Sequence, residues 1–318
     1  MGFPADAPCP VPPDRKPEGG CVERIPAKSI LSARQKDGWF ASSYTMNLYR
    51  GCCHGCIYCD SRSECYGIAD FDRVRAKQDA IALLKRELRG KRAAATVLTG
   101  SMSDPYNPFE KEERLTRQSL EALRSEGFGA AVLTKSPLLT RDTDVLAAIG
   151  CRAPVSVSMT VTTAEDALCR RIERNVAPSS LRFAALETLS AAGIPCGVLL
   201  SPILPFINDT EENIAQIVRR AADAGCRWVY SAMPFGVTLR QNQRLYFYDR
   251  LAEDFPGMRE RYAASFGDRY ECWSPAGKRL WRTFEALCGE YRLMYRMEEI
   301  SAALLAPFRA EQLSLLGE

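Results

Sequence analysis

The sequence predicts an α/β protein in which short buried strands alternate with amphipathic helices along most of the chain. Apolar segments such as 96–99 and 155–160 have the length of buried strands. The segments between them carry apolar residues at helical spacing, and glycines such as Gly90 and Gly193 mark where helices end. The length of 318 residues, with 46% hydrophobic and 25% charged residues, is sufficient for one large core.

The first half of the chain contains strands and helices in alternation. The first strand leads directly into a cysteine-rich loop, and the helix after that loop has Ile81, Leu84 and Leu88 on one face. The expected strands are 44–49, 96–99, 130–134 and 155–160, and the expected helices are 76–89, 110–126 and 142–149.

Two further pairs of a helix and a strand follow. Leu181, Ala185 and Leu189 lie four residues apart on a helix that ends at Gly193, and Asp209 begins a capping-box variant. The expected strands are 196–200 and 228–233, and the second helix covers 209–224. Strands that alternate with helices favour a parallel sheet with right-handed crossovers. We therefore expect a partial (β/α)6 barrel of the TIM type, short of the eight units of the complete barrel.

The chain divides into three expected regions. Residues 1–28 are rich in proline and glycine and lack periodicity, which indicates an extended N-terminal arm. Residues 29–235 contain the strands and helices of the partial barrel. Residues 236–318 are expected to form a helical C-terminal extension that packs on the substrate side of the barrel.

The loop after the first strand contains three cysteines with the spacing C-x3-C-x2-C, namely Cys52, Cys56 and Cys59. Thiolates hold iron–sulfur clusters, most often four at a time, so a set of three leaves one iron open to a reactant. Gly51 and Gly55 permit the positive φ angles with which a backbone curls around a ligand. The loop therefore predicts an iron–sulfur site with one open position.

A structural zinc site is the alternative interpretation of this loop. Cys53 and His54 lie among the three cysteines and could add ligands. Zinc modules usually pair two short ligand motifs, and no second motif is evident in the sequence. This alternative predicts a zinc-stabilised nucleic-acid-binding protein without radical chemistry.

The cysteine spacing resembles the signature of the radical S-adenosylmethionine (radical SAM) enzymes, and Tyr58 matches the aromatic residue that often precedes their last cysteine. The resemblance implies a [4Fe-4S] cluster on Cys52, Cys56 and Cys59, with S-adenosyl-L-methionine on the fourth iron. It implies reductive cleavage of that cofactor to a 5′-deoxyadenosyl radical, which abstracts a hydrogen atom from a substrate. It also implies the partial barrel and an electron donor of the flavodoxin or ferredoxin type. An iron–sulfur protein without this chemistry is a further alternative.

Within that family the chain resembles the spore photoproduct lyase group, from about residue 28 to residue 300. The resemblance rests on segments at the carboxyl ends of expected strands, where parallel α/β folds bind ligands. It implies that Ser103, Lys135 and Ser158 contact S-adenosyl-L-methionine. A lysine can meet the carboxylate of this cofactor as a point charge, and the two hydroxyls can serve its amine or ribose.

Arg182 and Tyr58 complete the expected cofactor site. Arg182 could also face the carboxylate of the cofactor, and a surface position on its helix is the alternative. Tyr58 is expected beside the adenine, and a place in the hydrophobic core is the alternative.

Two residues depart from the pattern of the photoproduct lyases. Ser101 stands where those enzymes have the cysteine that returns a hydrogen atom to the product, and Asp60 stands where they have a tyrosine. An S–H bond gives up its hydrogen to a carbon radical, whereas a serine O–H bond is far stronger. We therefore expect the fold and the radical generation of that group with a different substrate or reaction.

The C-terminal extension interleaves arginines with aromatic residues between residues 238 and 250. Such a pattern can hold single-stranded or flipped bases, and the alternative is a helix with one apolar face and solvated arginines. Cys272, Tyr246 and Tyr248 are candidates for the missing hydrogen donor. A nucleic-acid base is the expected substrate, and a peptide or a small metabolite is the alternative.

The composition limits the partners and the cellular location that we expect for the protein. A net charge of +3, from 42 basic and 39 acidic residues, gives no global field that favours nucleic acid. Residues 1–13 lack the apolar core of a signal peptide, and no apolar run has membrane-spanning length. From these two observations we expect a cytoplasmic protein whose 13 cysteines, an odd number, are reduced. We also expect no membrane contact and a monomer.

Overall fold

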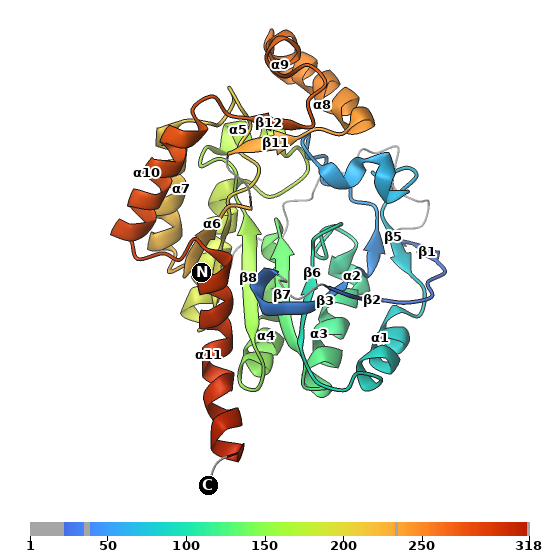
Figure 1. Ribbon diagram of the computed structural model, residues 1–318. Helices are drawn as coiled ribbons and strands as arrows, with labels where there is room; N and C mark the ends of the chain where they lie inside the picture. Colours follow the sequence, from blue (N-terminus) through green and yellow to red (C-terminus); the bar gives the residue numbers. More distant parts are fainter. Residues whose placement is uncertain (1–21, 35–38, 233–234, 317–318) are drawn as a thin grey trace.

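The computed structural model describes residues 22–34, 39–232 and 235–316. Its centre is a sheet of seven strands in the order β10-β9-β8-β7-β6-β3-β2 (Figure 1). Six strands are parallel, and β2 at one edge runs antiparallel to β3. Within the described ranges β10 and β2 do not pair, so the sheet is an open partial barrel. The strands are β2 Leu31–Ala33, β3 Ser42–Met46, β6 Thr96–Thr99, β7 Gly129–Thr134, β8 Val155–Thr160, β9 Cys196–Leu199 and β10 Trp228–Tyr230.

The six parallel strands confirm the predicted α/β partial barrel. β6 and β8 have the predicted bounds, and the other four overlap the predicted segments. The helices that follow the strands cover one face of the sheet and contribute to its main hydrophobic core (Figure 1). These helices are α1 Ala80–Arg89, α3 Leu115–Ser125, α4 Thr143–Gly150, α6 Ser179–Ala191 and α7 Glu211–Asp223.

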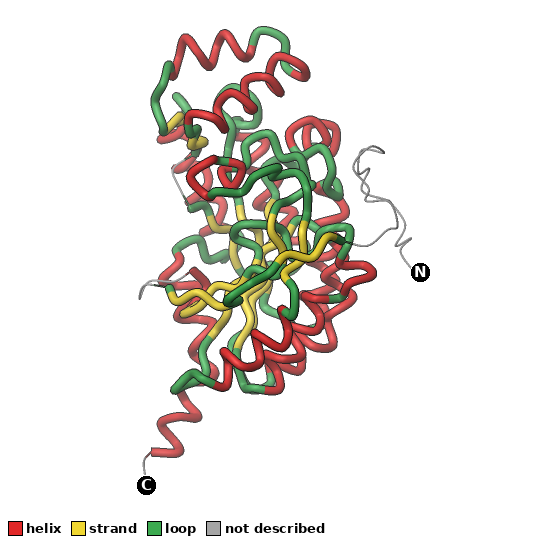
Figure 2. Tube along the Cα trace, turned by 90° about the vertical axis from the view of Figure 1, so that its right-hand side faces the viewer, coloured by secondary structure: helices red, strands yellow, loops and turns green. Residues whose placement is uncertain are grey.

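The two faces of the sheet belong to different hydrophobic clusters. In β7, Ala130 and Val132 join the main core, whereas Ala131 and Leu133 join a second cluster, because successive strand residues point to opposite faces. Helix α11, Met297–Leu316, contributes to this second cluster, and its C-terminal end projects beyond the body of the protein (Figures 1 and 2).

The prediction of one continuous helix over 110–126 is wrong, because Arg114 interrupts it. Arg114 has a φ of 50°, and the chain forms α2 Glu110–Glu113 before α3. The buried carboxylate of Glu110 accepts the backbone N–H of Thr116 at 3.0 Å. A carboxylate at this position satisfies a free donor in the first turn of α3, so the second helix starts anew.

The chain around the cysteine loop also differs from the prediction. The strand expected over 44–49 ends at Met46, and the chain then forms a second, smaller sheet in the order β1-β5-β4. The middle strand of this sheet includes residues 76 and 77, so the helix expected over 76–89 begins later, at Ala80. The strands are β1 Glu23–Ile25, β4 Tyr49–Arg50 and β5 Arg75–Lys77. Residues 1–21 of the expected arm lie outside the described residues.

Two boundaries in the second half of the chain shift as well. The side chain of Thr210 accepts the backbone N–H of Asn213, so Thr210 is the N-cap of α7 in place of Asp209. β10 ends at Tyr230, and the predicted end at residue 233 lies outside the described residues.

The C-terminal part of the chain begins over the carboxyl ends of the parallel strands, where α8 and α9 lie at the top of Figure 1. β11 pairs antiparallel with β12, and α10 returns to pack against α7. These elements are β11 Gly236–Thr238, α8 Gln241–Asp254, α9 Met258–Phe266, β12 Glu271–Trp273 and α10 Gly277–Glu290. Within the part of the chain that the structure describes, no helix is both long and apolar enough to cross a membrane.

Candidate active site

The three predicted cysteines lie on the loop that follows β4. Cys52 and Cys56 are buried, and Cys59 is partly exposed. Burial raises the pKa of the Cys56 thiol well above its ordinary value, and Glu173, Cys59 and Cys52 add to the shift. Burial and the Cys52 thiol likewise raise the pKa of Cys59. The backbone N–H of Cys59 donates to the carbonyl oxygen of Cys56 at 3.3 Å, so these two cysteines lie on one turn of the loop.

Gly51 explains the tight path of the loop. It has a φ of +81°, and an added Cβ would lie 2.3 Å from the carbonyl oxygen of Arg73 and 2.7 Å from that of Phe71. The next N–H, that of Cys52, donates to the carbonyl oxygen of Phe71 at 2.8 Å. The backbone of Cys52 is therefore held to the segment that contains Phe71, and only glycine fits at position 51.

The zinc alternative for this loop requires several ligands around one ion. The described residues contain no group of three or more His, Cys, Asp or Glu side chains that could hold a metal ion. A zinc site with Cys53 and His54 therefore gains no geometric support from the described residues.

Asp104 joins the cysteine loop to the ends of two strands. Its carboxylate lies 3.6 Å from Nδ1 of His54, and both side chains are buried. It accepts hydrogen bonds from the Thr134 hydroxyl at 2.6 Å and from the Lys135 backbone N–H at 2.7 Å. Burial opposes the charge on His54, but Cys52 and Asp104 outweigh it and raise the pKa of His54 to about 9.

Ser103 lies in the loop after β6 and Ser158 lies in the carboxyl half of β8, and both are buried. The Ser103 hydroxyl donates to the carbonyl oxygen of Tyr49 at 3.1 Å. The Ser158 hydroxyl accepts the indole N–H of Trp228 at 3.0 Å, which leaves its own proton for another acceptor.

Lys135 follows β7 and lies beside Tyr58. Its Nζ is 5.8 Å from the centre of the Tyr58 ring, within the range of a cation–π contact. Burial opposes the charge on Lys135, but the Cys56 thiol and the Glu173 carboxylate outweigh it and raise the pKa of Lys135. The lysine is therefore charged and faces the same region as the cysteines.

Arg182 reaches this region through Glu173. The Tyr58 hydroxyl donates a hydrogen bond to Glu173, and Glu173 forms an ion pair with Arg182 at 2.6 Å. Both charged side chains are 0% exposed. Arg182 also donates to the carbonyl oxygens of Thr160 at 2.7 Å and Ala177 at 2.8 Å. The alternative of a surface position for Arg182 is therefore wrong.

Sequence reasoning missed Glu173 and the segment around it. This segment runs along the cysteine loop, where the Ile57 N–H donates to the carbonyl oxygen of Ile172 at 3.0 Å. The Asn175 N–H donates to the carbonyl oxygen of His54 at 3.0 Å. No motif or spacing relates residues 172–175 to the cysteines, which lie far earlier in the chain.

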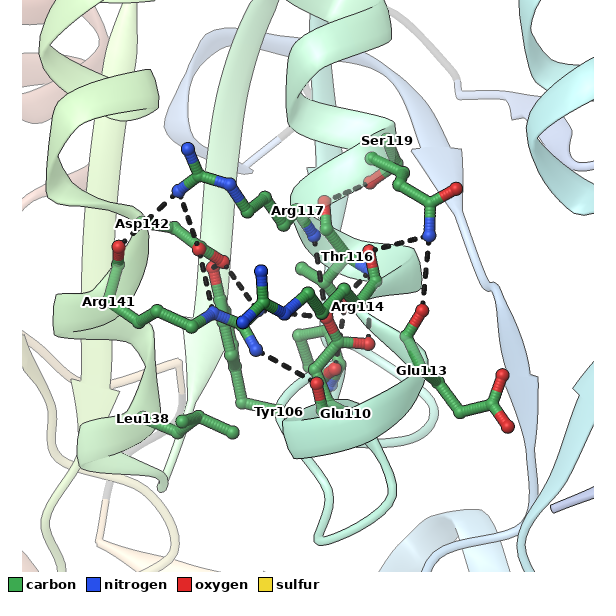
Figure 3. A network of polar contacts seen from close by, with 12 residues as sticks. Tyr106, Glu110, Glu113, Arg114, Thr116, Arg117, Ser119, Leu138, Arg141 and Asp142 are labelled. Atoms are coloured by element: carbon green, nitrogen blue, oxygen red, sulfur yellow. Dashed lines mark hydrogen bonds and ion pairs between the residues drawn. The ribbon is translucent and has the colours of Figure 1, made fainter. Parts of the chain in front are cut away.

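A second buried polar network anchors the loop after β6. Glu110 accepts hydrogen bonds from the Tyr49 hydroxyl at 2.5 Å and from Arg141 at 3.0 Å. Arg141 also contacts Asp142, whose carboxylate accepts the Tyr106 hydroxyl at 3.0 Å (Figure 3). Through Tyr49, this network also fixes the entry to the cysteine loop.

Helix α8 holds the cysteine loop from another side. The Gln243 side chain donates to the carbonyl oxygen of Tyr58 at 3.1 Å, and Arg240 forms an ion pair with Asp60 at 3.0 Å. Arg244 is buried and donates to the carbonyl oxygen of Gly267 at 2.7 Å. The segment 238–250 thus has an apolar face as in the alternative interpretation, but these two arginines bind protein groups.

The three candidate hydrogen donors lie on α8 and β12. Cys272 and Tyr248 are buried in the hydrophobic cluster that also contains Tyr58, and Tyr246 lies under the guanidinium of Arg62 at 3.8 Å. Their role as hydrogen donors stays a prediction.

A separate hollow of about 300 Å³ lies beside α5, Asp166–Ile172, and its lining includes none of the predicted site residues. The hollow is lined by Glu165, Ala167, Leu168, Arg171, Phe206, Ile207 and Phe255.

An open parallel sheet with three thiols on the loop after its first parallel strand, and polar side chains at the next three strand ends, defines the radical SAM class of enzymes. The family model of the radical SAM superfamily matches residues 46–233, which is more than half of the chain. The chain therefore belongs to the radical SAM superfamily. It is an enzyme with radical chemistry, and its family uses S-adenosyl-L-methionine, an iron–sulfur cluster and a reductant.

Relatives in two organisms share much of the chain. A protein of Mycobacterium tuberculosis, described as uncharacterized, is 31% identical over 299 residues, which are 92% of this chain and 82% of that protein. A protein of Methanocaldococcus jannaschii with the same description is 31% identical over 199 residues, 61% of this chain and 72% of that protein.

Solved structures show the same fold. Spore photoproduct lyase complexed with a dinucleoside spore photoproduct has a TM-score of 0.61 at 13% identity, over 84% of this chain and 79% of that chain. A variant of that enzyme with bound AdoMet and the dinucleoside has a TM-score of 0.61 at 13% identity, over 81% and 78%. The resemblance in fold to spore photoproduct lyase is thus confirmed.

Proposed function

We propose that Cys52, Cys56 and Cys59 hold a [4Fe-4S] cluster whose fourth iron binds S-adenosyl-L-methionine. A cluster held there, once reduced by an external electron donor, would supply the chemistry of one-electron cleavage of the cofactor, and the resulting 5′-deoxyadenosyl radical would abstract a hydrogen atom from the substrate. The observation that supports the proposal is that Lys135, at the end of β7, lies 5.8 Å from the centre of the ring of Tyr58 on the loop of the three cysteines, within a chain that matches the radical SAM superfamily.

The protein side chains bind and orient the cofactor in this proposal. Lys135 meets the carboxylate of the cofactor as a point charge. Ser103 and Ser158 offer hydroxyls to its amine or ribose from the ends of β6 and β8. Tyr58 packs beside the adenine. Arg182 acts through its ion pair with Glu173 instead of facing the carboxylate of the cofactor.

We propose a nucleic-acid base as the substrate, in a reaction other than the reversal of a thymine photoproduct. The likeness in fold to a lyase complexed with a dinucleoside supports the class of substrate. The absence of a hydrogen-return residue at two positions supports the different reaction. Ser101 is exposed, and Asp60 is bound to Arg240 and accepts the Tyr66 hydroxyl at 2.6 Å. A peptide or a small metabolite is the alternative substrate.

The proposal includes the surroundings of the enzyme. The electron is expected from a donor of the flavodoxin or ferredoxin type, and the enzyme is expected to act as a cytoplasmic monomer. Size-exclusion chromatography with light scattering tests the oligomeric state, and a dimer mass would contradict it.

Metal analysis after anaerobic reconstitution with iron and sulfide tests the cluster. We expect a brown protein with about four irons per chain, as for a [4Fe-4S] cluster. A colourless protein with one zinc per chain would overturn the proposal and restore the zinc alternative.

An assay with a dinucleoside thymine photoproduct tests the expected difference in reaction. The reconstituted enzyme with dithionite and S-adenosyl-L-methionine is expected to leave this substrate unrepaired, because neither Ser101 nor Asp60 can return a hydrogen atom. Efficient repair would show that this inference from the two substitutions is wrong.

A further inference from the structure

Glu173 has a carboxylate that contacts or influences three of the residues assigned to the cofactor site, namely Tyr58, Arg182 and Lys135. Its side chain accepts the Tyr58 hydroxyl and pairs with Arg182 at 2.6 Å. Its charge also acts on Lys135, whose pKa it helps to raise after burial has opposed the charge. The proposed function gives Glu173 no contact with the cofactor, so its position calls for a separate explanation.

The backbone around Glu173 places this carboxylate with little freedom. Glu173 forms an antiparallel bridge with Cys56, and the Asn175 side chain donates to the carbonyl oxygen of Cys53 at 2.9 Å. The far end of the ion pair is fixed as well, because Arg182 donates to the carbonyl oxygen of Thr160 at the end of β8. A chain of contacts therefore connects β8 to the cysteine loop through two buried charges.

The charges in this region explain why Arg182 is the ion-pair partner of Glu173. Arg182 forms the ion pair with Glu173 at 2.6 Å, whereas the ammonium of Lys135 lies 5.8 Å from the centre of the Tyr58 ring. With Arg182 satisfying Glu173, the ammonium of Lys135 keeps its charge for an incoming anion. Without Arg182, Glu173 would attract Lys135 as its only strong partner and withdraw it from that anion.

We propose that Glu173 is a positioning residue that, held by Arg182, orients the Tyr58 ring and leaves Lys135 available for the carboxylate of S-adenosyl-L-methionine. The inference rests on the proposed function and assigns to this ion pair the task of preforming the cofactor site. It predicts that changes in this chain of contacts weaken cofactor binding while the cluster stays in place.

The test compares iron content with cofactor affinity in matched variants. Tyr58→Phe keeps the ring and removes the hydroxyl that Glu173 accepts, and Glu173→Gln keeps an acceptor and removes the charge. Asp166→Asn is the control, because Asp166 lies on the helix before Glu173 and its carboxylate accepts hydrogen bonds from the backbone N–H and the hydroxyl of Ser180. Iron per chain and equilibrium dialysis of S-adenosyl-L-methionine are measured anaerobically on reconstituted protein.

We expect Tyr58→Phe to bind the cofactor about tenfold more weakly at unchanged iron content, the size of one hydrogen bond to a charged group. Asp166→Asn is expected to match the wild type. Arg182→Met combined with Glu173→Gln is expected to bind better than Arg182→Met alone, since the double variant releases Lys135.

The outcomes separate the two proposals. If the wild type binds the cofactor and both Tyr58→Phe and Glu173→Gln bind it equally well, the positioning role is overturned while the proposed function stands. If Glu173→Gln fails to fold, Tyr58→Phe decides alone. A wild type that holds iron but binds no S-adenosyl-L-methionine overturns the proposed function, and the positioning role falls with it.

Discussion

Two buried glutamates, Glu110 and Glu173, each bind a tyrosine hydroxyl and an arginine, yet their charges behave in opposite ways. Burial raises the pKa of Glu110, and its hydrogen bonds to Tyr49, Thr116 and Arg141 only partly offset the shift. Burial also acts on Glu173, but Arg182 and Lys135 outweigh it and lower its pKa.

The difference lies in the partners. The arginine of Glu110, Arg141, is 21% exposed, and the other partners of Glu110 are uncharged donors. Glu173 has a fully buried arginine and a second cation near it. We infer that the Glu110 network holds the fold of the loop after β6, whereas the Glu173 network needs its charge to serve the cofactor site.

The largest expected effect is that of Arg182→Met. This change leaves the Glu173 carboxylate buried without its ion-pair partner, so we expect a loss of about 3–5 kcal/mol in the free energy of unfolding. Chemical denaturation of the protein measures it. Adding Glu173→Gln should recover most of the loss, and a single variant as stable as the wild type would contradict the importance of the pair.

Glu110→Gln is expected to cost less and to act on stability alone. An amide can keep part of the hydrogen bonding, so the expected loss is about 1–3 kcal/mol in the free energy of unfolding. Iron content and cofactor affinity should match those of the wild type. Loss of iron in this variant would erase the distinction between the two networks.

Lys135→Ala should act on the cofactor alone. Removing the cation opposite the carboxylate is expected to weaken S-adenosyl-L-methionine binding about tenfold to a hundredfold, with iron content unchanged. Lys85→Ala, which removes an exposed lysine from α1, serves as the control. Unchanged affinity in Lys135→Ala would remove this residue from the cofactor site.

The pH dependence of stability gives the smallest expected effect. Because the folded state raises the pKa of Glu110 above 4.5, the proton on Glu110 stabilises the fold below that pH. This contribution is lost as the pH rises through the folded pKa. The stability of the wild type relative to Glu110→Gln should therefore fall as the pH rises from about 4 to 7. A difference that grows with pH would show the opposite shift.

Local signals sufficed for the parallel strands of the central sheet and for the spacing of the cysteines. Segments such as 96–99 and 155–160 are short, apolar and bounded by turn residues, so their type and bounds follow from the sequence. The spacing of Cys52, Cys56 and Cys59 is likewise local. The roles of Ser103, Lys135 and Ser158 come from the resemblance to the spore photoproduct lyase group and stay a prediction, while their position near strand ends agrees with where parallel sheets bind ligands.

Contacts between distant segments could not be predicted in the same way. The break at Arg114 depends on a carboxylate that turns back to cap α3, and helical periodicity does not reveal such a contact. Glu173 meets Tyr58 only because the chain after α5 runs along the cysteine loop. The bond from Gln243 to that loop depends in turn on the placement of α8.

Formation of 5′-deoxyadenosine tests the central claim most directly. Reconstituted wild-type protein with dithionite and S-adenosyl-L-methionine should form it, and Cys59→Ala, which lacks one cluster thiolate, should form none above background. If the wild type carries its full complement of iron and releases no 5′-deoxyadenosine, or if Cys59→Ala releases as much as the wild type, the three-cysteine loop does not generate the radical.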